Sequence, residues 1–122
     1  MKSSENFVNI LKKICQEDTR YKADAYYFVL AALNSTIEKL KRKGHVTGQE
    51  LLAGIRAYGM QEYGRMARTV LEHWGVKKTE DFGHIVFNMV KEKLLGKTET
   101  DKLDDFRNVY DFKQVFEDEY SY

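Results

Sequence analysis

The chain has 122 residues, of which 43% are hydrophobic and 32% are charged, with a formal net charge of +1 at pH 7. These values are typical of one globular domain with a hydrophobic core and exclude an intrinsically disordered chain. No window approaches about 18 consecutive apolar residues, and the polar start MKSSENF argues against a secretory signal, so we expect a cytoplasmic protein without a membrane span.

Two helices are predicted in residues 1–44. Ser3 or Ser4 can cap the first, whose apolar residues recur at helical spacing: Phe7, Ile10, Leu11 and Ile14. Cys15 lies beside this stripe, and we interpret it as a small buried residue rather than a reactive thiol. As the single cysteine it forms no internal disulfide, which fits a reducing compartment. After a polar connector at 16–22, a helix with a wide apolar face is predicted over 23–43, ended by Gly44.

The segment Lys41–Lys43 places three cations in the last turn of that second helix. The helix dipole favours cations there, so helix-end electrostatics explains the cluster, and contact with phosphates is the alternative interpretation. A third helix begins at a capping box, in which Thr47 and Glu50 each accept a hydrogen bond from the other's backbone N–H. It runs to about Gly64, and Gly54 and Gly59 inside it predict close packing against a neighbouring helix.

Residues 66–95 predict a short helix, a tight turn at Gly75 and a longer helix over 79–95 with Thr79 as its cap. After Gly96, the segments 97–99 and 108–112 predict two short strands joined by a polar loop. This order of elements is typical of a winged helix-turn-helix. We therefore expect a mainly α fold with a small C-terminal β-hairpin: a five-helix domain that is winged helix-turn-helix-like in its C-terminal two-thirds.

The whole chain, 1–122, is predicted to be a single domain. It comprises N-terminal helices (1–44), a winged-helix-like part (45–112) and a C-terminal tail (113–122), in which Val115, Phe116 and Tyr120 indicate one or two amphipathic turns. Charge is uneven along it: residues 1–78 carry 14 Lys and Arg against 8 Asp and Glu, and residues 79–122 carry 6 against 11. We favour attraction between the two parts within the fold, with a basic binding face as the alternative.

The sequence contains no recognisable catalytic, metal-binding or cofactor-binding motif. His45, His73 and His84 are isolated, the glycines are scattered without a βαβ pattern, and the acidic residues near Asp104 lack EF-hand spacing. Only a convergence in space that the sequence does not reveal could form a metal or catalytic site. We therefore expect no cofactor and no enzymatic activity.

Three strings resemble a family of short bacterial proteins to which no activity is assigned: HVTGQELLAGIR, VLEHWGVKKTEDFGHIVFNMV and KTETDKLDDFRNVYDF. The resemblance extends over residues 21–116, which is most of the chain. It implies a bacterial origin and one compact domain. It implies no functional residue, because the family has no assigned activity.

Two functions remain, both based on binding. The first is a protein-interaction domain that binds a partner protein or another copy of itself, with three aromatic residues as candidate anchors: Tyr27, Phe87 and Tyr110. The second is a nucleic-acid-binding protein that uses helix 79–95 and hairpin 97–112, with five candidate contacts: His84, Asn88, Lys91, Lys77 and Lys78. The acidic residues of the proposed wing would repel phosphates, so we favour the protein-interaction domain.

Overall fold

The structure, a computed structural model, describes residues 2–41, 46–96 and 102–119, with side chains from residue 6 onward. It contains five α-helices: α1 (Lys2–Glu17), α2 (Ala23–Leu40), α3 (Gly48–Tyr63), α4 (Ala67–His73) and α5 (Thr79–Lys91). Three short helical turns accompany them: η1 (Gly64–Met66), η2 (Leu103–Phe106) and η3 (Gln114–Asp118). The five predicted helices are confirmed.

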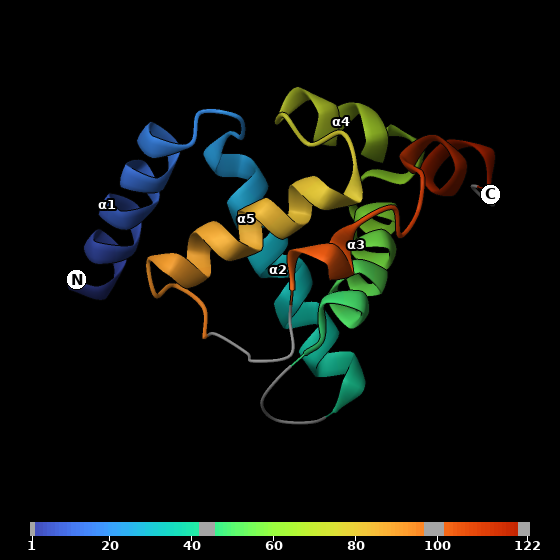
Figure 1. The fold of residues 1–122 in the computed structure, drawn as a ribbon. Coiled ribbons are helices and arrows are strands. Elements are labelled where there is room, and N and C mark those ends of the chain that lie inside the picture. The colour runs from blue at the N-terminus through green and yellow to red at the C-terminus, as the bar shows by residue number, and fades with distance from the viewer. Residues whose placement is uncertain (1, 42–45, 97–101, 120–122) are drawn as a thin grey trace.

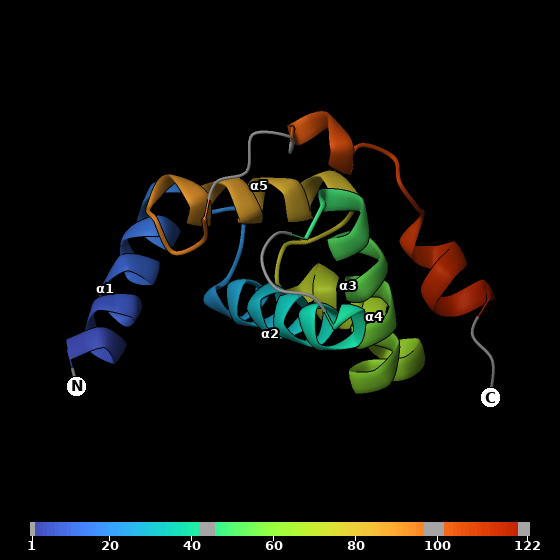
Figure 2. The ribbon, with the colours of Figure 1, turned by 90° about the horizontal axis from the view of Figure 1, so that it is seen from below.

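The helices pack around α2, which lies beside α3 and is crossed by α5 (Figure 1). In both views α1 lies at one end of the molecule. Residues 102–119, hereafter the C-terminal segment, begin with η2 beside α5 and end with η3 at the other end, beside α3 and α4 (Figure 2). The core takes side chains from every helix. Its largest fully buried members include Tyr26 of α2, Leu52 of α3 and Phe82 of α5, joined by Phe106 and Phe116 of the C-terminal segment.

The capping box at the start of α3 is confirmed. The Thr47 hydroxyl accepts from the backbone N–H of Glu50 (3.1 Å), and the Glu50 carboxylate accepts from the backbone N–H of Thr47 (2.9 Å). Gly54 and Gly59 of α3 also pack closely, as predicted. A β-carbon at Gly54 would lie 1.8 Å from Oγ1 of Thr36 on α2, and one at Gly59 would touch the ring of Phe116. These glycines therefore allow α3 to approach α2 and the C-terminal segment.

Two predicted helix ends are displaced. The second helix ends at Leu40 rather than at 43, because Lys41 adopts a left-handed conformation (φ 52°) and donates its N–H to the carbonyls of Ile37 and Glu38. Gly44, Arg42 and Lys43 lie outside the described residues. The helix predicted over 79–95 ends at Lys91 because Lys93 is also left-handed (φ 65°). Hydrogen bonds from Leu94 to Met89 and from Lys93 to Val90 complete a Schellman motif there.

The start of α5 also differs from the prediction. Thr79 is the first helical residue, and Lys78 occupies the cap position. Asp81 accepts the backbone N–H groups of Lys77 (2.8 Å) and Lys78 (3.2 Å) instead. Thr79 is fully buried, and its hydroxyl accepts the backbone N–H of Val109 (3.2 Å). The Thr79 side chain therefore holds the C-terminal segment rather than capping the helix.

The prediction of a C-terminal β-hairpin, and with it a winged helix, is wrong: residues 102–119 contain no strand. The expected strand 108–112 cannot form because Asn108 has a left-handed conformation (φ 51°) that breaks an extended run. Phe112, Val115 and Phe116 follow helical spacing, and all three are buried. Residues 97–101, which include the other expected strand, lie outside the described part of the chain.

Acidic side chains cap the helical turns of the C-terminal segment. Asp105 accepts the backbone N–H of Lys102 (2.9 Å) at η2, and Asp111 accepts that of Gln114 (3.0 Å) at η3. Asp105 and Asp111 therefore serve as helix-capping groups. Within residues 2–41, 46–96 and 102–119, no helix combines the length and apolar character that a membrane crossing requires.

Candidate functional site

The five candidate nucleic-acid contacts are distributed along the whole of α5. Lys77 and Lys78 are exposed just before the helix, His84 and Asn88 are half-buried, and Lys91 is exposed at its last turn. The distance along the helix from Lys78 to Lys91 is about 20 Å at 1.5 Å per residue. The structure therefore does not bring all five residues together.

The amide of Asn88 is occupied by contacts within the protein. Its Nδ2 donates to Oδ2 of Asp18 (2.9 Å) and to the hydroxyl of Tyr26 (3.0 Å). The Asp18 carboxylate also accepts from Nε and Nη2 of Arg20 at 2.9 and 2.7 Å. These hydrogen bonds join the end of α1 to α2 and α5, and they use the Nδ2 donor of Asn88, one of the two groups that would read a base.

The ionisation of this network follows from its contacts. The hydrogen bonds from Arg20, with a further one from Asn88, hold the pKa of the Asp18 carboxyl well below its usual range. Burial raises the pKa of the Tyr26 hydroxyl to about 12. Asp18 is therefore ionised and Tyr26 is neutral at physiological pH, which suits a fixed hydrogen-bonding role.

Asn88 and Lys91 share a polar cleft of about 350 Å³ between α1 and α5. Five further residues line it: Ile14, Glu17, Asp18, Arg20 and Glu92. Three of its charges are already paired, because Arg20 binds Asp18 and Glu92 binds Lys13 at 3.2 Å. We interpret this cleft as a polar joint between α1 and α5. The sequence analysis missed it, since its residues come from positions far apart in the chain.

A second hydrogen-bonded pair resembles catalytic geometry but serves to cap α5. The hydroxyl of Tyr21 donates to Oδ1 of Asp81 at 2.5 Å. Burial and this hydrogen bond raise the pKa of Tyr21, so the hydroxyl stays protonated. Because Oδ2 of Asp81 accepts two backbone N–H groups, both oxygens are satisfied, and the pair fixes the helix start.

The histidines and carboxylates do not converge on a metal site in the described part of the chain. No group of three His, Cys, Asp or Glu side chains there could hold a metal ion. His73 lies 3.5 Å from the amine of Lys22, and His84 lies on α5, while His45 falls outside the described residues. Cys15 is half-buried, and burial raises its thiol pKa, which disfavours the reactive thiolate.

The three candidate aromatic anchors have different surroundings. Phe87 is half-buried, with its ring 6.4 Å from that of Phe106 in an edge-on arrangement. Tyr110 donates its hydroxyl to the carbonyl of Leu52 (2.8 Å), and burial raises its pKa. Tyr27 is 49% exposed. Of these three aromatic residues, Tyr27 therefore offers the largest fraction of its surface to a partner.

Tyr27 belongs to an apolar surface formed by α1 and α2, which we call the Tyr27 face. Its ring lies 5.7 Å from that of Phe7 on α1, and Val8 beside Phe7 is 41% exposed. Helical spacing places four uncharged residues of α2 next to Tyr27: Ala23, Leu30, Ala31 and Asn34. It also places one charged residue, Asp24, one turn before Tyr27. The Tyr27 face therefore combines an aromatic ring and an aliphatic side chain with mostly uncharged neighbours.

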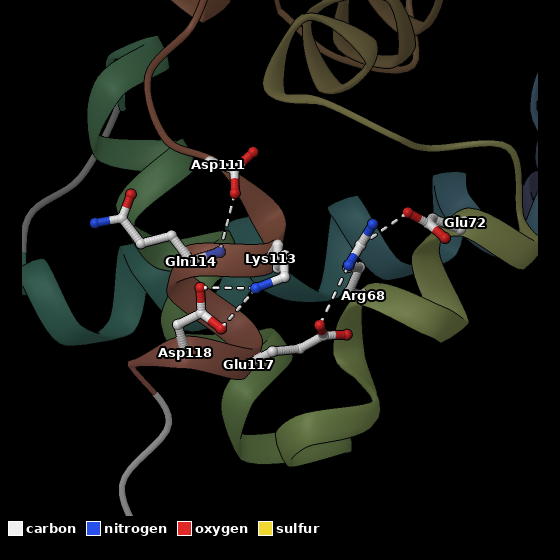
Figure 3. Close-up of polar contacts among 7 residues, drawn as sticks. All are labelled: Arg68, Glu72, Asp111, Lys113, Gln114, Glu117 and Asp118. Carbon is white, nitrogen blue, oxygen red and sulfur yellow. Dashed lines mark hydrogen bonds and ion pairs between the residues drawn. The ribbon is translucent and has the colours of Figure 1, made fainter.

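The charged residues of the C-terminal segment pair with the basic part of the chain (Figure 3). The Arg68 guanidinium of α4 lies between Glu72 (3.0 Å) and Glu117 (3.2 Å), and Arg56 of α3 binds Glu119 at 2.9 Å. Lys113 pairs with Asp118 within the segment at 3.0 Å. The Arg68–Glu117 and Arg56–Glu119 pairs join residues from the basic and acidic parts of the sequence, as attraction within the fold requires.

No protein-family model, curated protein or solved structure matches the chain. The resemblance of residues 21–116 to short bacterial proteins therefore stays a prediction. We therefore infer the function from the geometry of the chain itself.

Proposed function

We propose that this chain is a non-catalytic helical protein-interaction domain whose contact surface is the Tyr27 face. The observation that carries the proposal is the 49% exposure of Tyr27 beside Phe7 and the exposed Val8. Tyrosine is enriched among the residues that dominate binding energy, because its ring buries a large apolar area and loses little conformational freedom. The nucleic-acid alternative loses the hairpin on which it depended, and we do not pursue it.

A second copy of the chain is the partner that this surface fits. In a symmetric dimer the same patch occurs on both subunits, so like groups come face to face. A charged centre would then repel itself, whereas the uncharged run Asn6–Ile10 and the uncharged neighbours of Tyr27 would not. The charged residues Lys12 and Asp24 lie one helical turn from Val8 and Tyr27, respectively, and solvent screens both because they are exposed.

Sedimentation velocity over a wide range of protein concentration tests this proposal. The wild type is expected to show a reversible monomer–dimer equilibrium. Tyr27→Glu should weaken it about tenfold or more, because it removes the anchor and places like charges opposite each other. Met66→Glu is the matched control, since Met66 is 57% exposed but lies on η1, outside the Tyr27 face.

The wild type remaining monomeric at every concentration would refute self-association through the Tyr27 face. Equal weakening by Tyr27→Glu and Met66→Glu would contradict its location. Circular dichroism of both variants would show that the helices remain formed, so a loss of the dimer could be attributed to the surface.

A further inference from the structure

Four aromatic rings meet where α2, α3 and the turn after α4 come together. The ring of Phe28 lies 5.5 Å from that of Tyr58, 6.1 Å from that of Tyr63 and 5.8 Å from that of Trp74. Tyr63 and Trp74 are themselves 5.9 Å apart, with their planes at 80°. Phe28 is buried, while the other three are half-buried. The cluster therefore has an internal ring and an accessible rim.

Two carboxylates flank this aromatic rim. Asp24 lies one helical turn before Phe28 on α2, and Glu62 lies one turn after Tyr58 on α3, so each carboxylate shares a face with one ring. Burial raises the pKa of the Tyr63 hydroxyl, and the negative charges of Glu62 and Asp24 add to this effect. Both carboxylates therefore raise the pKa of the same residue of the cluster, Tyr63.

The two acidic groups have no counter-ion in the described part of the chain. Both side chains are exposed, and neither Asp24 nor Glu62 forms an ion pair with another residue there. Of the cations that lie close to them in sequence, Lys22 has its amine 3.5 Å from His73, and Arg65 has an interaction of its own. Aromatic faces and unpaired carboxylates together attract a cation, by the ring quadrupole and by charge.

We propose that the surface formed by Tyr58, Tyr63, Trp74, Asp24 and Glu62, the acidic aromatic patch, binds a cationic side chain of a partner protein. Arginine fits best, because its planar guanidinium stacks on an aromatic ring while its N–H groups donate to a carboxylate. This binding is distinct from self-association. Tyr27 and Phe28 are consecutive residues of α2 and point about 100° apart, so the two surfaces are centred on different sides of that helix and adjoin at Asp24.

The test uses the single tryptophan of the chain as its reporter. The full chain is titrated with N-acetyl-arginine amide, and the Trp74 indole N–H resonance is followed by NMR. N-acetyl-citrulline amide, which has nearly the same shape without the charge, serves as the control probe. We expect a saturable shift with the arginine probe, little shift with the citrulline probe, and weaker arginine binding at high salt.

A double variant, Asp24→Asn with Glu62→Gln, should weaken arginine binding roughly three- to tenfold, as expected for the loss of two exposed charges. Glu38→Gln is the matched control, because it removes a carboxylate from the same helix about 21 Å from Asp24. Tyr27→Ala, which adds no charge beside Asp24, should leave arginine binding unchanged, which separates this proposal from the self-association of the chain.

The proposal is overturned if the arginine probe gives no saturable shift, or if both probes shift the resonance equally. It is also overturned if the double variant binds arginine as the wild type does. Because both substituted carboxylates are exposed, the fold should be retained, and the dispersion of the amide resonances in the same spectra would verify this.

Discussion

The carbonyl oxygen of Arg20 lies 2.0 Å from the point where a β-carbon on Gly75 would stand. Gly75 is in a left-handed conformation (φ 94°), and the neighbouring carbonyl of Trp74 accepts the backbone N–H of Lys22 (3.0 Å). The turn after α4 is therefore pressed against the connection between α1 and α2. A side chain at this position would push two backbone segments apart.

We predict that Gly75→Ala destabilises the fold by about 3 kcal/mol, through the left-handed strain and the backbone clash together. Urea unfolding followed by circular dichroism measures this change. Gly96→Ala is the matched control, since nothing lies within 4 Å of a β-carbon there, and it should change stability by less than about 0.5 kcal/mol. Equal effects of the two substitutions would contradict the prediction.

Gly54→Ala is predicted to destabilise the protein by about 2 kcal/mol, although alanine is the better helix former by about 1 kcal/mol. The added methyl group would overlap Oγ1 of Thr36. That hydroxyl cannot easily turn away, because it donates to the carbonyl of Ala32 at 2.7 Å. In a Thr36→Ala background, Gly54→Ala should destabilise much less, because Oγ1 is gone and only the β-carbon of residue 36 remains close, at 3.0 Å. A double-mutant cycle on unfolding free energies measures the coupling, and additive effects would disprove it.

Lys93→Gly should stabilise the protein by about 0.5–1 kcal/mol. Lys93 holds the left-handed position of the Schellman motif after α5, where a β-carbon is strained and glycine is not. The same change at Lys91, the last residue of α5, should destabilise by about the same amount, because glycine is a poor helix former. Thermal unfolding of the two variants tests the contrast, which would be refuted if both melted at the same temperature.

Asp18 should make stability depend on pH in the acidic range. Hydrogen bonds from Arg20 lower the pKa of its carboxyl in the folded state relative to the unfolded chain. The ionised group therefore stabilises the fold above about pH 4, and this stabilisation is lost as the pH falls below that value.

Asp18→Asn is consequently expected to destabilise the protein by about 1–3 kcal/mol at neutral pH, the range for hydrogen bonds to a charged group. The difference from the wild type should shrink as the pH is lowered toward 2. Urea unfolding at several pH values measures it. A difference that stays constant across this range would show that the Asp18 charge contributes nothing.

Local sequence signals predicted the helices well. The Thr47–Glu50 capping box was predicted correctly because its two residues lie within one helical turn. Gly54 and Gly59 were also interpreted correctly, because the absence of a side chain allows close packing. The C-terminal segment was assigned wrongly. Over so short a run, its aromatic residues are compatible with either a strand or a helix. The left-handed conformation of Asn108 interrupts the strand alternative at its first residue.

The candidate surfaces were harder to predict than the helices. Apolar periodicity places Tyr27, Phe87 and Tyr110 at positions of similar character, yet the packing of other segments leaves Tyr27 exposed and covers much of the other two. The acidic aromatic patch combines α2, α3 and the turn after α4. One helical turn separates Asp24 from Phe28, a local signal, but nothing local places Trp74 beside Tyr63.

Three core residues of the C-terminal segment affect co-translational folding: Phe106, Phe112 and Phe116. These buried rings are translated after every helix they pack against. A nascent chain that has already emerged as far as α5 therefore still lacks part of its interior, and it exposes apolar surface that the finished protein hides. The core is therefore completed only after residues 102–119 have been translated.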